Sequence, residues 1–396
     1  MPRRSPDFQL LFETRHLVSE IVETRRDLHR HPELGFCENR TAGIVAERLR
    51  GLGLEVRTGV AKTGVVGLLR GARPGKTLLV RADMDALPLP EERETPYRSQ
   101  VESVMHACGH DGHVAIALAA AKVLAARRSE IAGNVKLCFQ PAEEGPGGAE
   151  PMIAEGVLRD PPVDAAIGLH IWNDLDIGQL GIGVGPMLAA EDEFGITVEG
   201  VGGHGAYPQD TVDPVVVASH IVVALQSIVS RNVGALEPAV VTVGTIKAGY
   251  AINIIPRTAV LTGTLRSYDE GVRATLVRRV KEIAEGVAGA FGARIQFAHD
   301  PGYPATVNDK AMSAFAAEHA AATFGAKNVV EPRRSMGAED MSYYLREVPG
   351  TFLFLGSRNP DRGLDAPHHS PLFDFDEAAL PAGTDVFVRT ALAFLR

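Results

Sequence analysis

The sequence lacks the features that mark several classes of protein. Three cysteines in 396 residues, an odd and sparse number, exclude a disulfide framework. The 40 basic residues are outnumbered by 49 acidic ones, and no basic run carries interleaved aromatics, so we expect neither nucleic acid nor an anionic membrane as a partner. No apolar run approaches the roughly 20 residues of a membrane span. No apolar segment follows the N-terminal arginines, so we expect no signal peptide and a soluble, cytoplasmic protein.

The chain is longer than one hydrophobic core usually serves, which favours two domains. In its first part, glycine and proline separate helical from β-rich segments, and the apolar strands are typical of a sheet covered on both faces. We expect helices at 10–30, 41–52 and 114–128, and strands at 55–60, 64–70, 76–81, 135–139 and 165–169. Strands that alternate with helices predict an α/β fold with a mainly parallel sheet.

From about residue 190 the order of elements changes. We expect a strand at 194–198, a helix at 214–230, strands at 240–246 and 259–265, a helix at 270–291 and a strand at 294–297. This βαββαβ order predicts a ferredoxin-like α+β module. The α/β pattern then resumes with a helix at 310–324, a strand at 351–355 and a helix at 382–395. We therefore predict a catalytic domain formed by 1–188 and 303–396, interrupted by an inserted domain at 189–302.

The stretch Met105–His113 is rich in metal-ligand residue types, with three histidines, one cysteine and one aspartate in nine positions. Cys108 and His110, one residue apart, offer the sulfur and nitrogen atoms that bind zinc or a similar divalent ion. The alternative is a polar loop that opens a helix, with His110 and His113 as caps or surface residues.

Other polar residues follow predicted buried strands, at the edge where ligands bind in open α/β sheets. These are Asp85, Glu143, Glu144 and His170. Of two adjacent carboxylates, one can bind a metal ion while the other transfers a proton, as amide hydrolysis requires. An acidic surface turn, a structural histidine and a solvated pair His368-His369 are the alternative readings. Together these groups supply enough ligands for two ions.

Two competing motifs are weaker. Gly200, Gly202 and Gly205 match the spacing of a dinucleotide-binding loop, but Pro208 and Pro214 leave no helix directly after it to hold a pyrophosphate. Cys108 as a catalytic nucleophile would leave the carboxylates without a role.

The motifs of the chain also carry a resemblance to a known family. In order, they are H-R-H-P-E-L-G-F, R-A-D-M-D-A-L-P, M-H-A-C-G-H-D-G-H, Q-P-A-E-E-G, G-L-H, G-x-G-G-H-G-A-Y-P, N-I-I-P, G-T-L-R-S, S-M-G-A-E-D-M-S-Y-Y and H-H-S-P. With them the sequence resembles the M20 metallopeptidases over nearly its whole length. More narrowly it is similar to their amidohydrolase branch, which includes hippurate hydrolases, N-acyl-amino-acid amidohydrolases and plant auxin-conjugate hydrolases.

The resemblance implies a zinc-peptidase-like catalytic domain with two divalent ions, for which zinc, manganese, cobalt and nickel all remain compatible. The implied ligands are Cys108, His110, Glu144, His170 and His369. Glu143 would be the general base and then the general acid. Asp85 and Asp111 would orient the ligands through hydrogen bonds.

The inserted domain would then serve as a dimerisation or lid domain, in a homodimer or dimer-based oligomer. His204 would stabilise the developing oxyanion in its own or its partner's active site. Asn253 would hold the substrate's amide oxygen, and Arg266 its free carboxylate. The chain departs from the family pattern at Asn173, Cys37, Ala338 and Met341, none of which is an implied ligand.

The implied reaction is hydrolysis of an N-acyl amino acid to a carboxylic acid and a free amino acid. Within the enzymes, the alternatives are a deacetylase of N-acetyldiaminopimelate and a dipeptidase. From another class, the alternative is a catalytically silent metal-binding homologue, which would have no need of a carboxylate such as Glu143 beside the ions.

Overall fold

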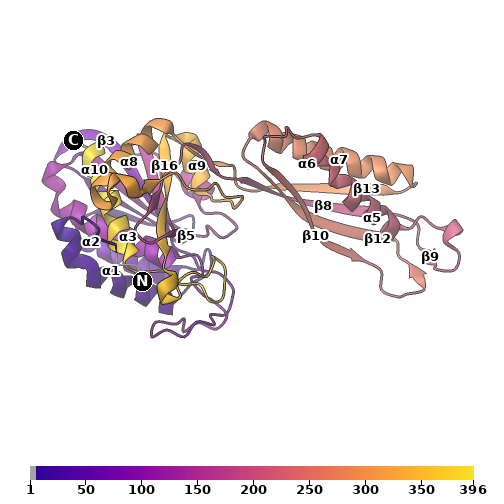
Figure 1. Cartoon of the computed structure of the whole chain (residues 1–396), viewed down its shortest axis with the longest axis horizontal. Helices are drawn as coiled ribbons and strands as arrows, with labels where there is room; N and C mark the ends of the chain where they lie inside the picture. The colour runs from indigo at the N-terminus through magenta and orange to yellow at the C-terminus, as the bar shows by residue number, and fades with distance from the viewer. Residues whose placement is uncertain (1–5) are drawn as a thin grey trace. The chain divides into compact units, whose positions relative to one another are not determined.

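The computed structural model describes residues 6–396, and the expectation about a signal peptide depends on N-terminal residues outside this range (Figure 1). The chain divides into two compact units. Unit 1 comprises Met1–Gly185, described from Pro6 on, with Val307–Arg333 and Asp340–Arg396. Unit 2 comprises Pro186–Thr306 and Arg334–Glu339. The catalytic and lid roles given to these parts of the chain stay predictions.

Unit 1 is built on an eight-stranded sheet in the order β1-β2-β4-β3-β5-β16-β6-β15. The strands are β1 (Glu55–Val60), β2 (Gly64–Arg70), β3 (Arg73–Asp83), β4 (Ala132–Gln140), β5 (Ala165–Asp176), β6 (Leu180–Gly181), β15 (Val329–Val330) and β16 (Gly350–Arg358). The four central strands β4, β3, β5 and β16 are parallel, whereas β1 and β2 are antiparallel to their neighbours. This confirms the predicted α/β fold with a mainly parallel sheet.

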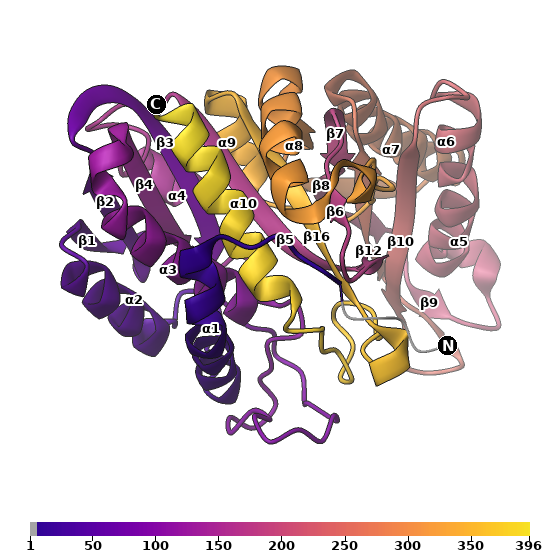
Figure 2. The ribbon, with the colours of Figure 1, turned by 60° about the vertical axis from the view of Figure 1, so that its left-hand side comes forward.

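Helices cover this sheet, and one of them is buried on nearly all sides. The helices of unit 1 are α1 (Phe12–Arg30), α2 (Asn39–Gly51), α3 (His110–Ala126), α4 (Ala149–Ala154), α8 (Lys310–Phe324), α9 (Met341–Glu347) and α10 (Ala379–Phe394). Alanine-rich α3 packs between the sheet and the helices α1 and α10 (Figure 2). A Cβ on Gly112 would lie 2.4 Å from Ile171 Cδ1, so this glycine permits the close approach of α3 to β5.

Some elements differ from the predicted ones. Helix α3 begins at His110 and not at Val114, because Gly109 adopts a left-handed conformation (φ 88°) directly before it. His110 and His113 therefore belong to the first turn of a helix. Strand β5 continues to Asp176 and not to Leu169, because β16 pairs with it over that length. The short helices α4 and α9 were not predicted.

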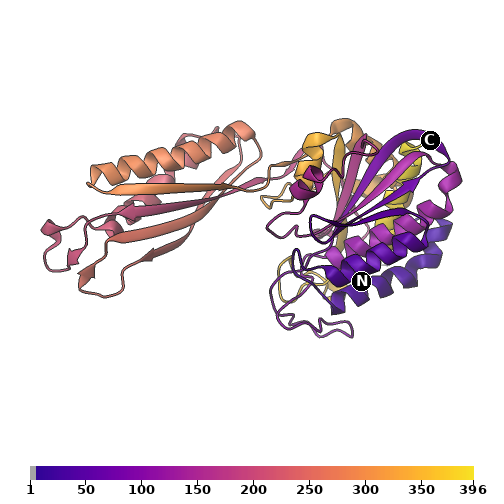
Figure 3. The same cartoon turned by 180° about the vertical axis from the view of Figure 1, so that it is seen from behind.

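Unit 2 contains a four-stranded antiparallel sheet in the order β10-β12-β8-β13 (Figure 3). Its strands are β8 (Ala190–Glu199), β10 (Ala239–Ala248), β12 (Thr258–Ser267) and β13 (Arg294–Pro301), and its helices are α5 (Pro214–Leu225), α6 (Ser227–Arg231) and α7 (Glu270–Ala290). The chain order is βαββαβ with the helix between β8 and β10 broken into two, which confirms the ferredoxin-like module. A separate small sheet pairs β9 (Gly203–His204) with β11 (Ile254–Ile255). The short strands β7 (Gly185–Leu188) and β14 (Thr306–Asn308) lie where the chain passes between the units.

One stretch of the described chain, Pro214–Arg231, is long and apolar enough to cross a membrane by length and composition alone. Its residues Val217, Ile221 and Leu225 are buried in the core of unit 2. A core helix of a globular domain passes the same test, so this stretch is weak evidence for a membrane span.

Candidate metal centre

The polar candidates of unit 1 gather at one edge of the central sheet. Strands β3 and β4 end level with each other, because Asp83, the last residue of β3, pairs with Gln140, the last residue of β4. The pairing of β5 with β3 stops at Gly168. The residues that follow these positions therefore lie at the carboxyl edge of the parallel strands, where α/β sheets bind ligands. They are Asp85, Glu143, Glu144 and His170.

His170 does not follow the end of its strand, so the prediction on this point is wrong. It lies inside β5, which continues because of its pairing with β16. Its position relative to β3 is still the predicted one, since β3 no longer pairs with β5 there.

His110, the first residue of α3, has one ring nitrogen fixed and the other available. Its Nδ1 lies 3.2 Å from Asp85 Oδ1, and a carboxylate fixes the tautomer that leaves Nε2 to bind a metal ion. Nε2 is buried and has no hydrogen-bond partner within residues 6–396. It lies 3.9 Å from Glu143 Oε2 and 4.0 Å from Glu144 Oε1. Burial lowers the pKa of His110, but the carboxylates of Asp83, Asp85 and Glu144 outweigh burial and raise this pKa to about 10.

Cys108 and His170 face each other, with Sγ and Nε2 3.4 Å apart. His170 Nδ1 donates to the carbonyl oxygen of Ile171, which directs the lone pair of Nε2 toward the sulfur. Burial lowers the pKa of His170, so the imidazole is neutral, as a metal ligand must be. Burial, followed by the Glu144 and Glu143 carboxylates, raises the pKa of the Cys108 thiol well above its usual value. These surroundings disfavour Cys108 as a thiolate nucleophile and would suit it to binding a cation.

The ligand atoms form overlapping groups that fit divalent ions. Within each group they lie within 4.8 Å of one another: Cys108, His110 and His170; His110, Glu143 and Glu144; and Cys108, Glu144 and His369. His369 Nε2 lies 3.2 Å from Glu144 Oε1. The set combines sulfur, nitrogen and oxygen donors, and among the described residues the buried Nε2 of His110 has no hydrogen-bond partner. This donor chemistry fits zinc or a comparable ion.

His113 is close to the same groups but differs from His110 in its hydrogen bonds. Its Nδ1 donates to Asp83, and its Nε2 accepts the backbone N–H of Ile171 at 2.8 Å. Both ring nitrogens are therefore engaged, and the Asp83 carboxylate also accepts from Arg81 Nη1 at 2.6 Å. We conclude that His113 supports the strand beside His170 and is not a ligand.

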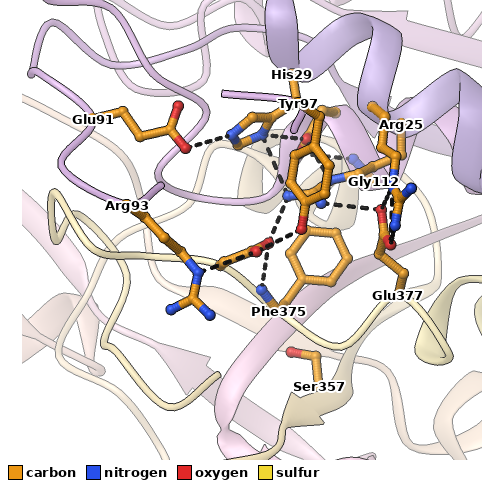
Figure 4. A network of polar contacts seen from close by, with 12 residues as sticks. Arg25, His29, Glu91, Arg93, Tyr97, Gly112, Ser357, Phe375 and Glu377 are labelled. Carbon is orange, nitrogen blue, oxygen red and sulfur yellow. Dashed lines mark hydrogen bonds and ion pairs between the residues drawn. The ribbon is translucent and has the colours of Figure 1, made fainter. Parts of the chain in front are cut away.

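Asp111 forms an ion pair with the buried residue Arg25. The guanidinium of Arg25 donates to Asp111 Oδ2 and Asp374 Oδ1, both at 2.8 Å, and lies 4.7 Å from the ring centroid of Tyr97 (Figure 4). His29 Nδ1 also lies 2.8 Å from Asp111 Oδ2. Burial raises the pKa of Asp111, but Arg25 and His29 outweigh it and hold this pKa well below its usual range. The charged network joins α1 to the first turn of α3.

Two predicted residues of unit 2 lie together. In the β9–β11 pair, His204 is directly opposite Ile254, and Gly205 N donates to Asn253 O at 2.8 Å. His204 Nδ1 accepts the N–H of Ala206 at 3.0 Å, which leaves the exposed Nε2 to donate a hydrogen bond.

Arg266, the third predicted residue of unit 2, lies on β12. It is directly opposite Glu191 of β8, and its Nη2 lies 2.8 Å from Glu191 Oε1. Both side chains are partly exposed. The guanidinium therefore already has one carboxylate partner.

Arg25 and Glu38 are buried charged residues that the sequence analysis missed. Arg25 shares one face of α1 with the buried residues Ile21, Leu28 and His29, and a charge on an apolar helical face was the available signal. Glu38 had no comparable signal, because it lies outside the predicted helices and strands, where no periodic pattern marks a buried face.

Several known proteins are similar to this chain over most of its length. A model of the peptidase family M20/M25/M40 matches residues 79–393. The putative amidohydrolase YhaA of Bacillus subtilis is 42% identical over 378 residues, covering 95% of this chain and 94% of that protein. An N-acyl-L-amino acid amidohydrolase of Geobacillus stearothermophilus is 43% identical, covering 75% and 81%. In the solved structures, the B. subtilis YXEP protein, described as a dinuclear metal binding peptidase from the M20 family, has a TM-score of 0.83 at 33% identity and covers 96% and 99%.

Proposed function

Because the chain belongs to peptidase family M20/M25/M40 and to its amidohydrolase branch, we propose that it hydrolyses the amide bond of N-acyl amino acids. The products are a carboxylic acid and a free amino acid. The observation that carries this proposal is the buried group of Cys108, His110 and His170 next to two adjacent carboxylates. The relatives of this chain include an N-acyl-L-amino acid amidohydrolase, which supports the proposed class of substrate.

We assign two divalent ions to Cys108, His110, Glu144, His170 and His369. Such ions lower the pKa of a water molecule and polarise an amide carbonyl. The hydrogen bond from His110 to Asp85 supports the assignment, because it aims Nε2 at the carboxylates. Zinc, manganese, cobalt and nickel are all compatible with these donors.

Glu143 is the proton-transfer residue of the proposal. Its carboxylate is nearly buried and lies beside His110 without being assigned to an ion. It would accept a proton from the attacking water and then deliver it to the nitrogen of the departing amino acid.

In unit 2, His204 would donate a hydrogen bond to the developing oxyanion, in its own subunit or across a homodimer. Asn253 would hold the amide oxygen and Arg266 the free carboxylate of the substrate. The ion pair of Arg266 with Glu191 then orients the guanidinium and leaves further N–H groups to bind the substrate. A cytoplasmic location and an assembly based on dimers complete the proposal.

The decisive experiment measures release of amino acids from N-benzoylglycine, N-acetyl amino acids and indoleacetyl amino acids. Release that a chelator abolishes and added metal restores supports the proposal, and the ranking of substrates gives the size of the acyl pocket. Activity on N-acetyldiaminopimelate or on dipeptides alone would favour those alternatives. Two bound ions without release from any substrate would favour a catalytically silent homologue.

A further inference from the structure

The loop that carries Glu143 and Glu144 has an unfavourable backbone conformation at its start. Ala142 has a φ of 53°, in the left-handed region that residues with a Cβ rarely adopt. The residue is fully buried. Because Ala142 directly precedes the proposed general base, its backbone angles set the direction in which the Glu143 carboxylate points. Within the loop, the carbonyl oxygen of Ala142 accepts the N–H of Gly147 at 3.0 Å. Its own buried N–H needs an acceptor from another part of the chain.

Glu38 makes that contact. Its Oε1 accepts the backbone N–H of Ala142 at 2.8 Å, although 104 positions separate the two residues. Its Oε2 accepts the hydroxyl of Thr63. Both carboxylate oxygens are therefore fixed, and the side chain is buried.

The position of Glu38 in its own helix supports a role directed at the loop. It is the N-cap residue of α2, yet its side chain makes no capping hydrogen bond. The free N–H groups of Arg40 and Thr41 are instead satisfied by Glu33, whose two carboxylate oxygens accept them at 2.8 Å each. Glu33 therefore caps the helix, and Glu38 is available to hold Ala142.

Gly35, between these two glutamates, brings the segment close to the loop. A Cβ at this position would lie 3.0 Å from Ala142 Cα and 3.0 Å from Gly145 O. Only a residue without a side chain lets the backbone approach so closely. The H-P-E-L-G-F-C-E stretch thus combines a helix cap, a close approach and a carboxylate acceptor.

Other carboxylates hold further backbone N–H groups of the loop. Asp85 Oδ2 accepts the N–H of Glu144 at 2.9 Å. Asp340 Oδ2 accepts those of Gly148 and Ala149 at 3.0 Å each. Of these carboxylates, Glu38 is the one whose substitution tests the loop most specifically. Asp85 also contacts His110, and Asp340 also contacts Arg81, so changes at these residues would disturb other groups as well.

We propose that Glu38 is a positioning residue for the reaction: its carboxylate holds Ala142 in the left-handed conformation and thereby aims Glu143 at the substrate. The proposal rests on the proposed function only in its use of Glu143 as the proton-transfer residue. It predicts that the placement of an acceptor oxygen at position 38 matters and that its negative charge does not.

The test compares Glu38→Gln with Glu38→Asp. Glutamine keeps an oxygen at the same reach for Ala142 and turns its amide toward Thr63, whereas aspartate keeps the charge but withdraws the oxygen by one methylene. We expect kcat of E38Q within about threefold of wild type and that of E38D to fall by about 10²-fold, the effect of a misplacement of about 1 Å. KM should change little in either variant, and rates are measured at saturating metal. An E38D enzyme as active as E38Q would overturn the proposal.

Asp385→Ala provides the matched control for Glu38→Ala. Asp385 is also a buried carboxylate that accepts one backbone N–H, from Leu11, and one threonine hydroxyl, from Thr323. We expect both alanine variants to lose thermal stability, but only E38A to lose kcat, by about 10²-fold. Equal kcat in the two variants would contradict a positioning role. If E38A does not fold, the E38Q and E38D pair decides.

Hydrogen exchange of peptides that cover residues 140–149 tests the contact without any substrate. Exchange in E38D should be faster than in wild type and in E38Q, and D385A should leave it unchanged. Unaltered exchange in E38D would overturn the proposal. If wild type releases no amino acid from any N-acyl substrate, the proposed function fails, while this measurement still decides whether Glu38 holds the loop.

Discussion

The candidate residues of unit 1 are mostly buried and fixed by hydrogen bonds, whereas His204 and Asn253 of unit 2 are exposed to solvent. In unit 1 His110 is oriented by Asp85, and Asp111 by Arg25. This difference in burial matches the different functions proposed for the two sets of residues. Groups that bind ions and transfer protons need a geometry fixed by folding, whereas groups that meet the substrate need access to it. Variants should therefore differ between the units in whether they change stability, activity or both.

The largest effect should come from Glu143→Ala. Loss of the proton-transfer group is expected to lower kcat by about 10³-fold or more, because general acid–base catalysis contributes up to about 10⁴-fold. Metal content, measured by elemental analysis, should stay near wild type, since Glu143 is not assigned to an ion. Glu150→Ala, which removes an exposed carboxylate seven positions along the chain, should leave kcat unchanged. A fully active E143A enzyme would rule out the assigned role.

Arg25→Met should reduce stability more than any change to the exposed residues of unit 2. It leaves Asp111 and Asp374 buried without their cation, a defect that typically costs about 3–5 kcal/mol in the free energy of unfolding. Denaturant titration measures the loss. Arg26→Met is the control. Both Arg25 and Arg26 pair with Glu377, but Arg26 is 38% exposed, and such pairs contribute about 0–1 kcal/mol. Equal losses in the two variants would contradict the importance of the buried network.

The same variant should change the acid sensitivity of the fold. Burial raises the pKa of Asp374, but Arg25 and the Tyr97 hydroxyl outweigh it and lower this pKa below its ordinary value. A carboxyl whose pKa is lower in the folded state stabilises the protein above its unfolded pKa of about 3.9 and loses this contribution as the pH falls through the folded pKa. Stability measured from pH 7 to pH 3 should therefore fall less steeply in R25M than in wild type.

A smaller effect, confined to substrate binding, should follow from Arg266→Met. Loss of a charged hydrogen bond to the substrate's carboxylate is expected to raise KM by about 10- to 100-fold. The melting temperature should change little, because both Arg266 and its partner Glu191 are partly exposed. Glu191→Gln removes the same ion pair but keeps the guanidinium, so its KM should not rise comparably. A loss of stability in R266M without a change of KM would contradict this prediction, because Arg266 would then stabilise the fold and not bind the substrate.

The central sheet and the types of the candidate ligands could be predicted from local sequence patterns. Apolar runs that end in polar residues predicted β3 and β4, and the spacing of Cys108 and His110 predicted metal ligands, although in a segment before the helix and not at its first residue, where His110 lies. The strands and the helix start then brought these residues together at one edge. Their assigned roles stay predictions.

The partners of the buried charges could not be predicted, because they are distant in sequence. Arg25 lies 86 positions from Asp111, and Glu38 lies 104 positions from Ala142. A charge becomes buried only if tertiary structure supplies a partner, and no local pattern records that partner. The difference between His110 and His113 has the same origin, since it depends on which distant groups engage each ring nitrogen.

The central claim, that the buried cluster of unit 1 binds two ions to hydrolyse amides, is tested most directly by titrating metal into chelated protein while recording release of glycine from N-benzoylglycine or of amino acids from other N-acyl substrates. The account predicts no release without metal and a rate that rises to a plateau at two equivalents of metal per chain. Full activity in the metal-free protein, or saturation of the cluster without release from any N-acyl amino acid, would contradict it.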